Sequence, residues 1–183
     1  MSLRLAPRLF GSIAVVATAL AALGCGGYSP PEDPRNTRDP MDIVRAHLRA
    51  LEAGDWAAAD ALIADSYTMK MQGMPFFISI DKAHALDVHK AREQAFPDYT
   101  FNEKMEKVGV NGVKLTVTWS GTHTGFLDYP VGDVPKMKAT GKKIALPAEY
   151  FTYYVEGDQI VYTYGEIPEG HGPPALKKQL GVE

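Results

Sequence analysis

Residues 115–127 read LTVTWSGTHTGFL and alternate between apolar and hydroxyl-bearing side chains. Leu115, Val117 and Trp119 fall on one parity, and threonine and serine residues occupy the other. A period of two predicts a β-strand with one buried and one more polar face. His123 falls on the apolar parity, so we expect it to face the interior, either as an acid/base group or as a packed side chain.

Three helices are predicted upstream of this strand. Each begins with an aspartate that can cap a helix N-terminus, followed by apolar residues at helical spacing. The caps are Asp39, Asp55 and Asp81, and the third helix runs to about Phe96. A short strand is expected between the second and third helices, around SYTMKM, with Tyr67, Met69 and Met71 on one parity.

The remainder of the chain has the alternation and turn residues of an antiparallel meander. Asn111-Gly112 and Gly157-Asp158 are typical two-residue hairpin loops. Strands are predicted at residues 99–108, 113–126, 143–155 and 159–167. This order of elements predicts an α+β fold in which one curved antiparallel sheet carries three helices on a single face.

The N-terminus has the pattern of an export signal. Arg4 and Arg8 precede an uncharged, apolar run that is too short for a comfortable bilayer span but suits a signal peptide, residues 1–24. The run ends in AALGC, which resembles the lipobox of bacterial lipoproteins and implies a lipid on Cys25. Ordinary cleavage and secretion is the alternative. Residues 25–39 are rich in proline and glycine and predict a disordered linker, followed by a domain over 40–183.

Composition excludes several classes of function. The formal net charge is −3 and there is no basic stripe, so we expect no nucleic-acid partner. We find no phosphate-binding glycine loop, no nucleophile motif and no cofactor fingerprint, and we expect no cofactor. His89 and Glu93 have i, i+4 spacing, but a helix surface often has such pairs, and we predict no metal site.

Five segments resemble SnoaL-like proteins of the NTF2-like superfamily, in the same order. They are LEAGDWAAADALIADSY, AFPDYTF, VTWSGTHTGFL, ATGKKIAL and VEGDQIV. The resemblance implies a cone-shaped α+β domain whose mouth can hold a small apolar molecule. We expect His123 to lie in this cone as a catalytic residue, and we expect five further side chains to bind the ligand: Tyr67, Met71, Trp119, Phe151 and Tyr164.

The last hairpin supplies two candidate acids. With a two-residue loop at Gly157-Asp158, Glu149 pairs with Glu166, and both glutamates share one face with aromatic residues. They either share a proton near His123 or lie in water at the rim of the sheet. In SnoaL-like cyclases an acid follows an aromatic residue on this strand; here that position is Gly165.

Two functions therefore remain open. The first is an envelope-anchored domain that binds a small apolar ligand with little or no catalysis. The second is a cyclase, isomerase or dehydratase that uses His123 with a glutamate. A homodimer that pairs through the outer face of the sheet is a further expectation.

Overall fold

The computed structural model describes residues 35–73, 76–130 and 134–182. The predicted signal peptide, Cys25 and most of the predicted linker lie outside these ranges. Within them, no helix combines the length and the apolar character needed to cross a bilayer.

All three predicted helices begin at their predicted caps. The helices are α1 (Pro40–Glu52), α2 (Trp56–Ala61) and α3 (Lys82–Ala95), and a fourth, α4 (Pro173–Leu180), follows the last strand. The cap carboxylates accept hydrogen bonds from backbone N–H groups of the first turn, at 2.8 Å for Asp39, 3.0 Å for Asp55 and 3.0 Å for Asp81. Each cap satisfies a donor that the helix itself leaves unpaired, which fixes where the helix starts.

Six strands form the main sheet, and two short strands form a second one. The strands are β1 (Ile63–Gly73), β2 (Phe76–Asp81), β3 (Lys104–Val108), β4 (Gly112–Val117), β5 (Ser120–Thr122), β6 (Lys143–Ala145), β7 (Glu149–Glu156) and β8 (Gln159–Ile167). The main sheet has the order β2-β1-β8-β7-β4-β3, and β5 pairs with β6. Only the pairing of β1 with β8 is parallel, so the predicted antiparallel α+β class is confirmed.

Several strand boundaries differ from the prediction. The predicted strand 113–126 leaves the main sheet after Val117 and continues as β5, and the predicted strand 143–155 divides into β6 and β7. Pro147 lies at the second break and has no N–H to donate to a neighbouring strand. β2 was not predicted: it follows β1 in the stretch between the second and third helices, where one short strand was expected. The first hairpin turns at residues 109–111, where Gly109 has φ of +66°, and not at Asn111-Gly112.

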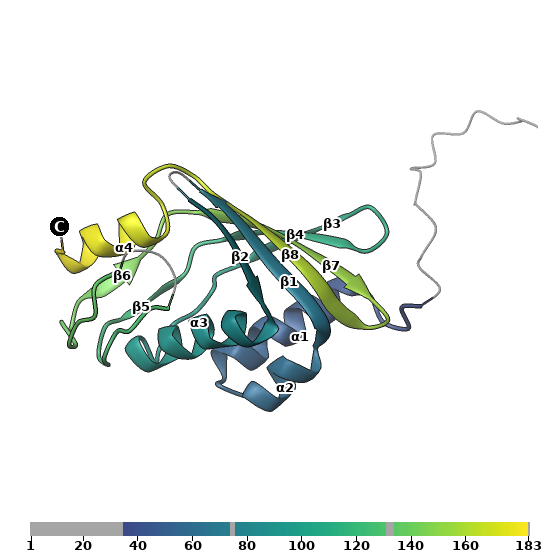
Figure 1. The fold of residues 1–183 in the computed structure, drawn as a ribbon, viewed down its shortest axis with the longest axis horizontal. Coiled ribbons are helices and arrows are strands. Elements are labelled where there is room, and N and C mark those ends of the chain that lie inside the picture. The colour runs from purple at the N-terminus through teal and green to yellow at the C-terminus, as the bar shows by residue number, and fades with distance from the viewer. Residues whose placement is uncertain (1–34, 74–75, 131–133, 183) are drawn as a thin grey trace, which may run out of the picture.

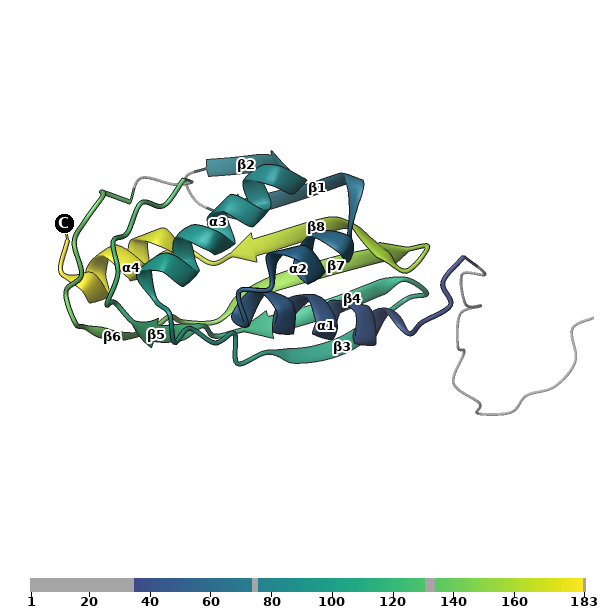
Figure 2. The same cartoon turned by 90° about the horizontal axis from the view of Figure 1, so that it is seen from below.

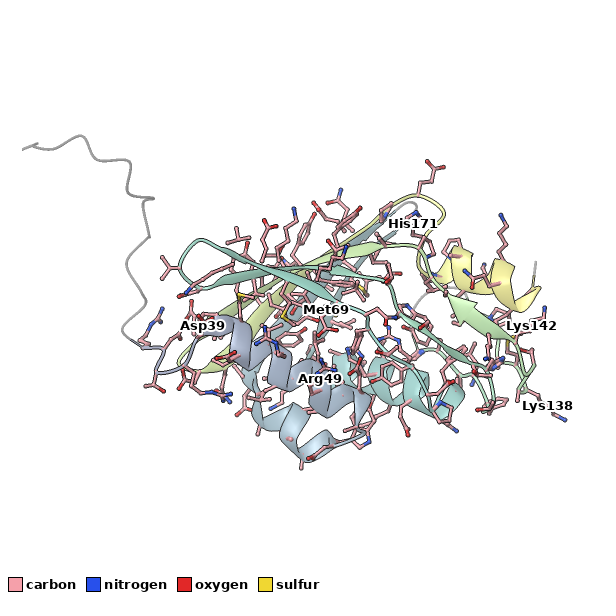
Figure 3. The ribbon with its side chains drawn as sticks, turned by 180° about the vertical axis from the view of Figure 1, so that it is seen from behind. Asp39, Arg49, Met69, Lys138, Lys142 and His171 are labelled. Atoms are coloured by element: carbon pink, nitrogen blue, oxygen red, sulfur yellow. The ribbon has the colours of Figure 1, made fainter. Side chains whose placement is uncertain are left out.

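The arrangement of the helices around the main sheet is visible in two views. Helices α1, α2 and α3 cover one face of the main sheet, and α4 lies beyond the ends of the strands beside β6 (Figures 1 and 2). Met69 of β1 points into the space between the sheet and the helices (Figure 3), and it is 8% exposed. The core therefore fills the concave side of the sheet, and α4 closes off one end of it.

The residues just before α1 are attached to the β7–β8 hairpin. The backbone N–H groups of Thr37 and Arg38 donate to Asp158 Oδ1 at 2.7 and 3.0 Å, and Arg35 pairs with Glu156. Gly157 and Asp158 form the predicted two-residue loop, both with positive φ. Residues 35–39, the described part of the predicted linker, thus lie at the end of the domain opposite to α4 (Figure 1).

Candidate functional site

A cavity opens between the inner face of the sheet, α3 and the start of α4. The space within its walls and the open solvent at its mouth together measure about 800 Å³, of which about 70 Å³ can hold the centres of water-sized molecules. Its walls are mostly apolar, and the lining residues are Met69, Met71, Ile78, Val88, His89, Arg92, Trp119, Tyr129, Leu146, Glu149, Phe151, Tyr153, Ile167, Gly172, Pro173 and Leu176. A mostly apolar cavity with a few polar side chains is the usual form of a small-molecule site.

Arg92 is the main polar feature of the cavity wall. It lies on the stripe of α3 that faces the core, and it is only 8% exposed. Its Nη2 donates to the hydroxyl of Tyr129 at 2.8 Å, and its Nη1 donates to Nδ1 of His89 at 3.1 Å. The guanidinium carbon lies 4.9 Å from the centre of the Trp119 ring. Two hydrogen bonds and a cation–π contact therefore fix the guanidinium in place.

His89 is held as a neutral imidazole. Because Nδ1 accepts from Arg92, the ring proton lies on Nε2. Burial lowers the pKa of His89 well below its ordinary value, and the electrostatic effects of Arg92 and His47 lower it further. At neutral pH, His89 therefore presents an N–H donor in the wall of the cavity.

Glu149 supplies a buried carboxyl group at the start of β7. It is 6% exposed, and burial raises its pKa to about 7, against the opposing effects of Arg92, His171 and the backbone N–H of Gly172. His171 lies on the loop before α4, labelled in Figure 3, where its Nδ1 donates to Ala148 O at 2.7 Å. In the described part of the chain, Glu149 makes no hydrogen bond or ion pair with Arg92, although both line the cavity.

At Gly165, the position where SnoaL-like cyclases carry an acid, there is no room for a side chain. Gly165 pairs with Phe151 across the last hairpin, and a Cβ atom at Gly165 would lie 2.8 Å from Cε1 of Phe151. The aromatic ring thus occupies the space that an aspartate side chain would need. Glu149 lies on the same inner face of β7, two residues before Phe151, and places a carboxyl group in the cone from a different strand.

The predicted pairing of Glu149 with Glu166 is wrong. A register shift after Tyr154 leaves one extra residue on β8, so Glu166 pairs with Tyr150. Glu166 is exposed on the outer face of the sheet. Tyr164 lies on the same outer face, where its hydroxyl donates to Gln72 Oε1 at 2.6 Å. Neither residue reaches the cone, because a shift of one residue moves a side chain to the other face.

His123 is buried, but it does not line the cavity. It has no exposed surface, its Nδ1 lies 3.0 Å from Thr140 Oγ1, and its ring packs 5.0 Å from that of Phe96. Burial lowers the pKa of His123. The prediction that His123 faces the interior is therefore confirmed. The prediction that it lies in the cone beside a glutamate is wrong.

The other predicted ligand-binding residues divide into two groups. Met71, Trp119 and Phe151 line the cavity, whereas Tyr67 is buried in the core beneath it. The sequence reasoning missed Arg92 and considered His89 only as a metal ligand. A signal for Arg92 was present, because it falls on an otherwise apolar helical stripe with Ala85, Val88 and Ala95.

Metal ligands do not gather around His89. Among residues 35–73, 76–130 and 134–182, no group of three or more histidine, cysteine, aspartate or glutamate side chains has the geometry to hold a metal ion.

The fold and the cavity define a class, that of small α+β domains with a cone closed by helices. The chain belongs to the SnoaL-like domain family, whose model matches residues 44–163. No curated protein sequence matches it.

Solved structures with similar folds are distant in sequence. Wild-type IdmH from Streptomyces antibioticus, a proposed polyketide cyclase, is 20% identical with a TM-score of 0.61, over 79% of this chain and 100% of that one. A proposed SnoaL-like polyketide cyclase from Jannaschia is 11% identical with a TM-score of 0.61, over 85% and 99%. AclR from Streptomyces galilaeus, a proposed hydroxylase, is 13% identical with a TM-score of 0.60, over 78% and 81%. These identities establish the fold alone.

Proposed function

We propose that the cone binds a small, mostly apolar molecule that carries an oxygen acceptor. The observation that carries this proposal is the cavity itself: its apolar walls come from β1, β2, α3, β7, β8 and α4, and Arg92, His89 and Tyr129 form a hydrogen-bonded polar cluster in the wall. The apolar walls favour the body of such a molecule through burial, and the N–H donors of the cluster orient its oxygen.

Binding can be measured through Trp119, which lines the cavity. The chain has two tryptophans, so a Trp56→Phe background leaves Trp119 as the only indole. We expect aromatic acids, ketones and lactones to quench its fluorescence saturably. Val88→Phe, which fills the cavity wall, should abolish quenching, whereas Val108→Phe, a matched change on an exposed valine, should not. Equal quenching in both variants would refute binding in the cone.

A second candidate function is proton transfer by Glu149. A carboxyl group with a pKa of about 7 can both accept and return a proton near neutral pH. As a carboxylate it would take a proton from a carbon next to a carbonyl group; the bonding pair would move to the carbonyl oxygen, beside Arg92 and His89, and the proton would return to carbon. This role requires no group at Gly165 or His123.

Proton transfer can be tested without knowledge of the natural substrate. Ketones that bind in the cone should exchange their acidic C–H protons with D₂O, as followed by NMR. Glu149→Gln should reduce the exchange to the uncatalysed rate, and Glu166→Gln, on the exposed outer face, should leave it unchanged. Exchange that persists in Glu149→Gln would exclude Glu149 as the base.

The cellular location and the assembly are also part of the proposal. The AALGC pattern supports a lipid-anchored envelope protein, with Cys25 outside the described residues; incorporation of labelled palmitate into the wild type but not Cys25→Ser would test this.

The outer sheet face carries exposed Tyr150 and Tyr154, which supports a homodimer through that face. Tyr154→Glu should then convert a dimer into a monomer in light scattering, and a wild-type monomer would refute it.

A further inference from the structure

Arg92 carries a buried positive charge, and its hydrogen-bond partners among the described residues are neutral. Its two hydrogen-bond acceptors are an imidazole and a phenol, and the rings around it belong to Trp119, Tyr99 and Phe101. Its Nε is buried without a hydrogen-bond partner in the described part of the chain. A buried cation that makes no ion pair is costly, because burial removes its hydration; the more distant Glu149 offsets part of that cost by raising the pKa of Arg92.

Neither Glu149 nor Glu52 forms an ion pair with Arg92. Glu149 lies beyond ion-pair distance, and its raised pKa keeps it partly protonated at neutral pH. Glu52 is engaged elsewhere, since its Oε1 accepts from the backbone N–H of Phe101 at 2.8 Å and from Thr100 at 3.0 Å. Arg92 is therefore a permanent cation of the cavity wall, whereas Glu149 is only partly ionised at neutral pH.

We propose that the ligand of the cone is an amphipathic monoanion, a carboxylate on an aromatic or aliphatic body, whose oxygens are bound at Arg92 and His89, which both line the cavity. This inference rests on the proposed function, because it specifies the ligand of the same cavity. The apolar body would lie against Met71, Phe151 and Leu176, which line the remaining walls.

The number of charges favours a carboxylate over a phosphate ester. The cavity wall provides one permanent cation, because His89 is neutral, so one negative charge is matched and a second would remain unpaired. The guanidinium is also already fixed by Tyr129, His89 and the aromatic rings, so an anion that binds it orders no new side chain. Hydrogen bonds from the guanidinium to a carboxylate are also stronger than hydrogen bonds to a neutral oxygen.

The experiment compares matched ligands with the purified protein. 2-Naphthoate and its neutral isostere 2-naphthamide are titrated by calorimetry into the wild type, Arg92→Gln, Arg92→Lys and the exposed control Arg45→Gln. We expect the wild type and Arg45→Gln to prefer the acid by at least about tenfold, because hydrogen bonds between charged groups contribute more than neutral ones. Arg92→Gln should abolish the preference, and Arg92→Lys should retain part of it.

Each outcome separates this inference from the proposed function. If neither ligand binds the wild type, the proposed function fails. If the amide binds as tightly as the acid, binding in the cone stands and the anion inference is overturned. A preference for the acid that persists in Arg92→Gln also overturns it, because the charge that selects the anion then lies elsewhere. Should Arg92→Gln fail to fold by circular dichroism, the wild-type comparison and Arg92→Lys still decide the question.

Discussion

Glu149 should make the stability of the domain fall as the pH rises. The unfolded carboxyl group ionises near its ordinary pKa of 4.5, whereas the folded one keeps its proton until about pH 7. In this window the folded state binds more protons than the unfolded state, so the free energy of unfolding decreases with pH and levels off above the folded pKa. At about 1.4 kcal/mol per pKa unit, the decrease attributable to Glu149 is roughly 3 kcal/mol.

Glu149→Gln isolates this effect, because glutamine has nearly the same shape and never ionises. Urea unfolding of the wild type and the variant between about pH 4 and pH 8 should give a difference in free energy that grows in favour of the variant as the pH rises. Glu166→Gln, an exposed glutamate of the same hairpin, should show no such trend. A difference between the wild type and Glu149→Gln that stays constant over the whole range would refute the buried, proton-retaining carboxyl group.

Three further changes test other parts of the molecule. Burial lowers the pKa of His47 to about 4, so the folded state binds fewer protons between about pH 4 and pH 6.5, and stability falls on acidification; His47→Gln should flatten this acid limb of the unfolding curve, and an unchanged limb would contradict it. Gly165→Ala should cost about 1–3 kcal/mol of stability through its contact with Phe151, and Phe151→Leu should relieve most of that cost; a neutral Gly165→Ala would show that the ring moves freely. His123→Ala should destabilise the fold by about 2–4 kcal/mol in denaturant unfolding yet leave ligand affinity unchanged, and a lost affinity in a folded variant would return His123 to the site.

The helices could be predicted closely because their signals are local. Each cap depends on one aspartate and a backbone N–H two or three residues later, so no distant part of the chain alters the outcome. The same holds for the Gly157-Asp158 loop, where both residues need positive φ. The fold class followed from these elements and from the resemblance to a family.

The site was harder to predict because it depends on tertiary placement. The loop at Gly157-Asp158 was right, yet one extra residue on β8 moved Tyr164 and Glu166 to the outer face, and nothing in the alternation marks that bulge. His123 keeps its inward parity, but its strand has already left the main sheet, so inward no longer means into the cone. Arg92 could have been noticed on its apolar stripe. The aromatic rings around it and its separation from Glu149 depend on the tertiary structure and could not be predicted from the sequence.

The attachment of residues 35–38 to the β7–β8 hairpin has a practical consequence for handling the protein. Residues 35–38 lie at the hairpin end, while Pro173 and Leu176 of α4 form part of the cavity wall at the other end. A purification tag, fluorophore or surface linker should therefore be attached on the N-terminal side of the domain, after the predicted cleavage site at Cys25. The same addition after α4 would be attached to a helix that forms part of the cavity wall, and it would therefore alter ligand binding.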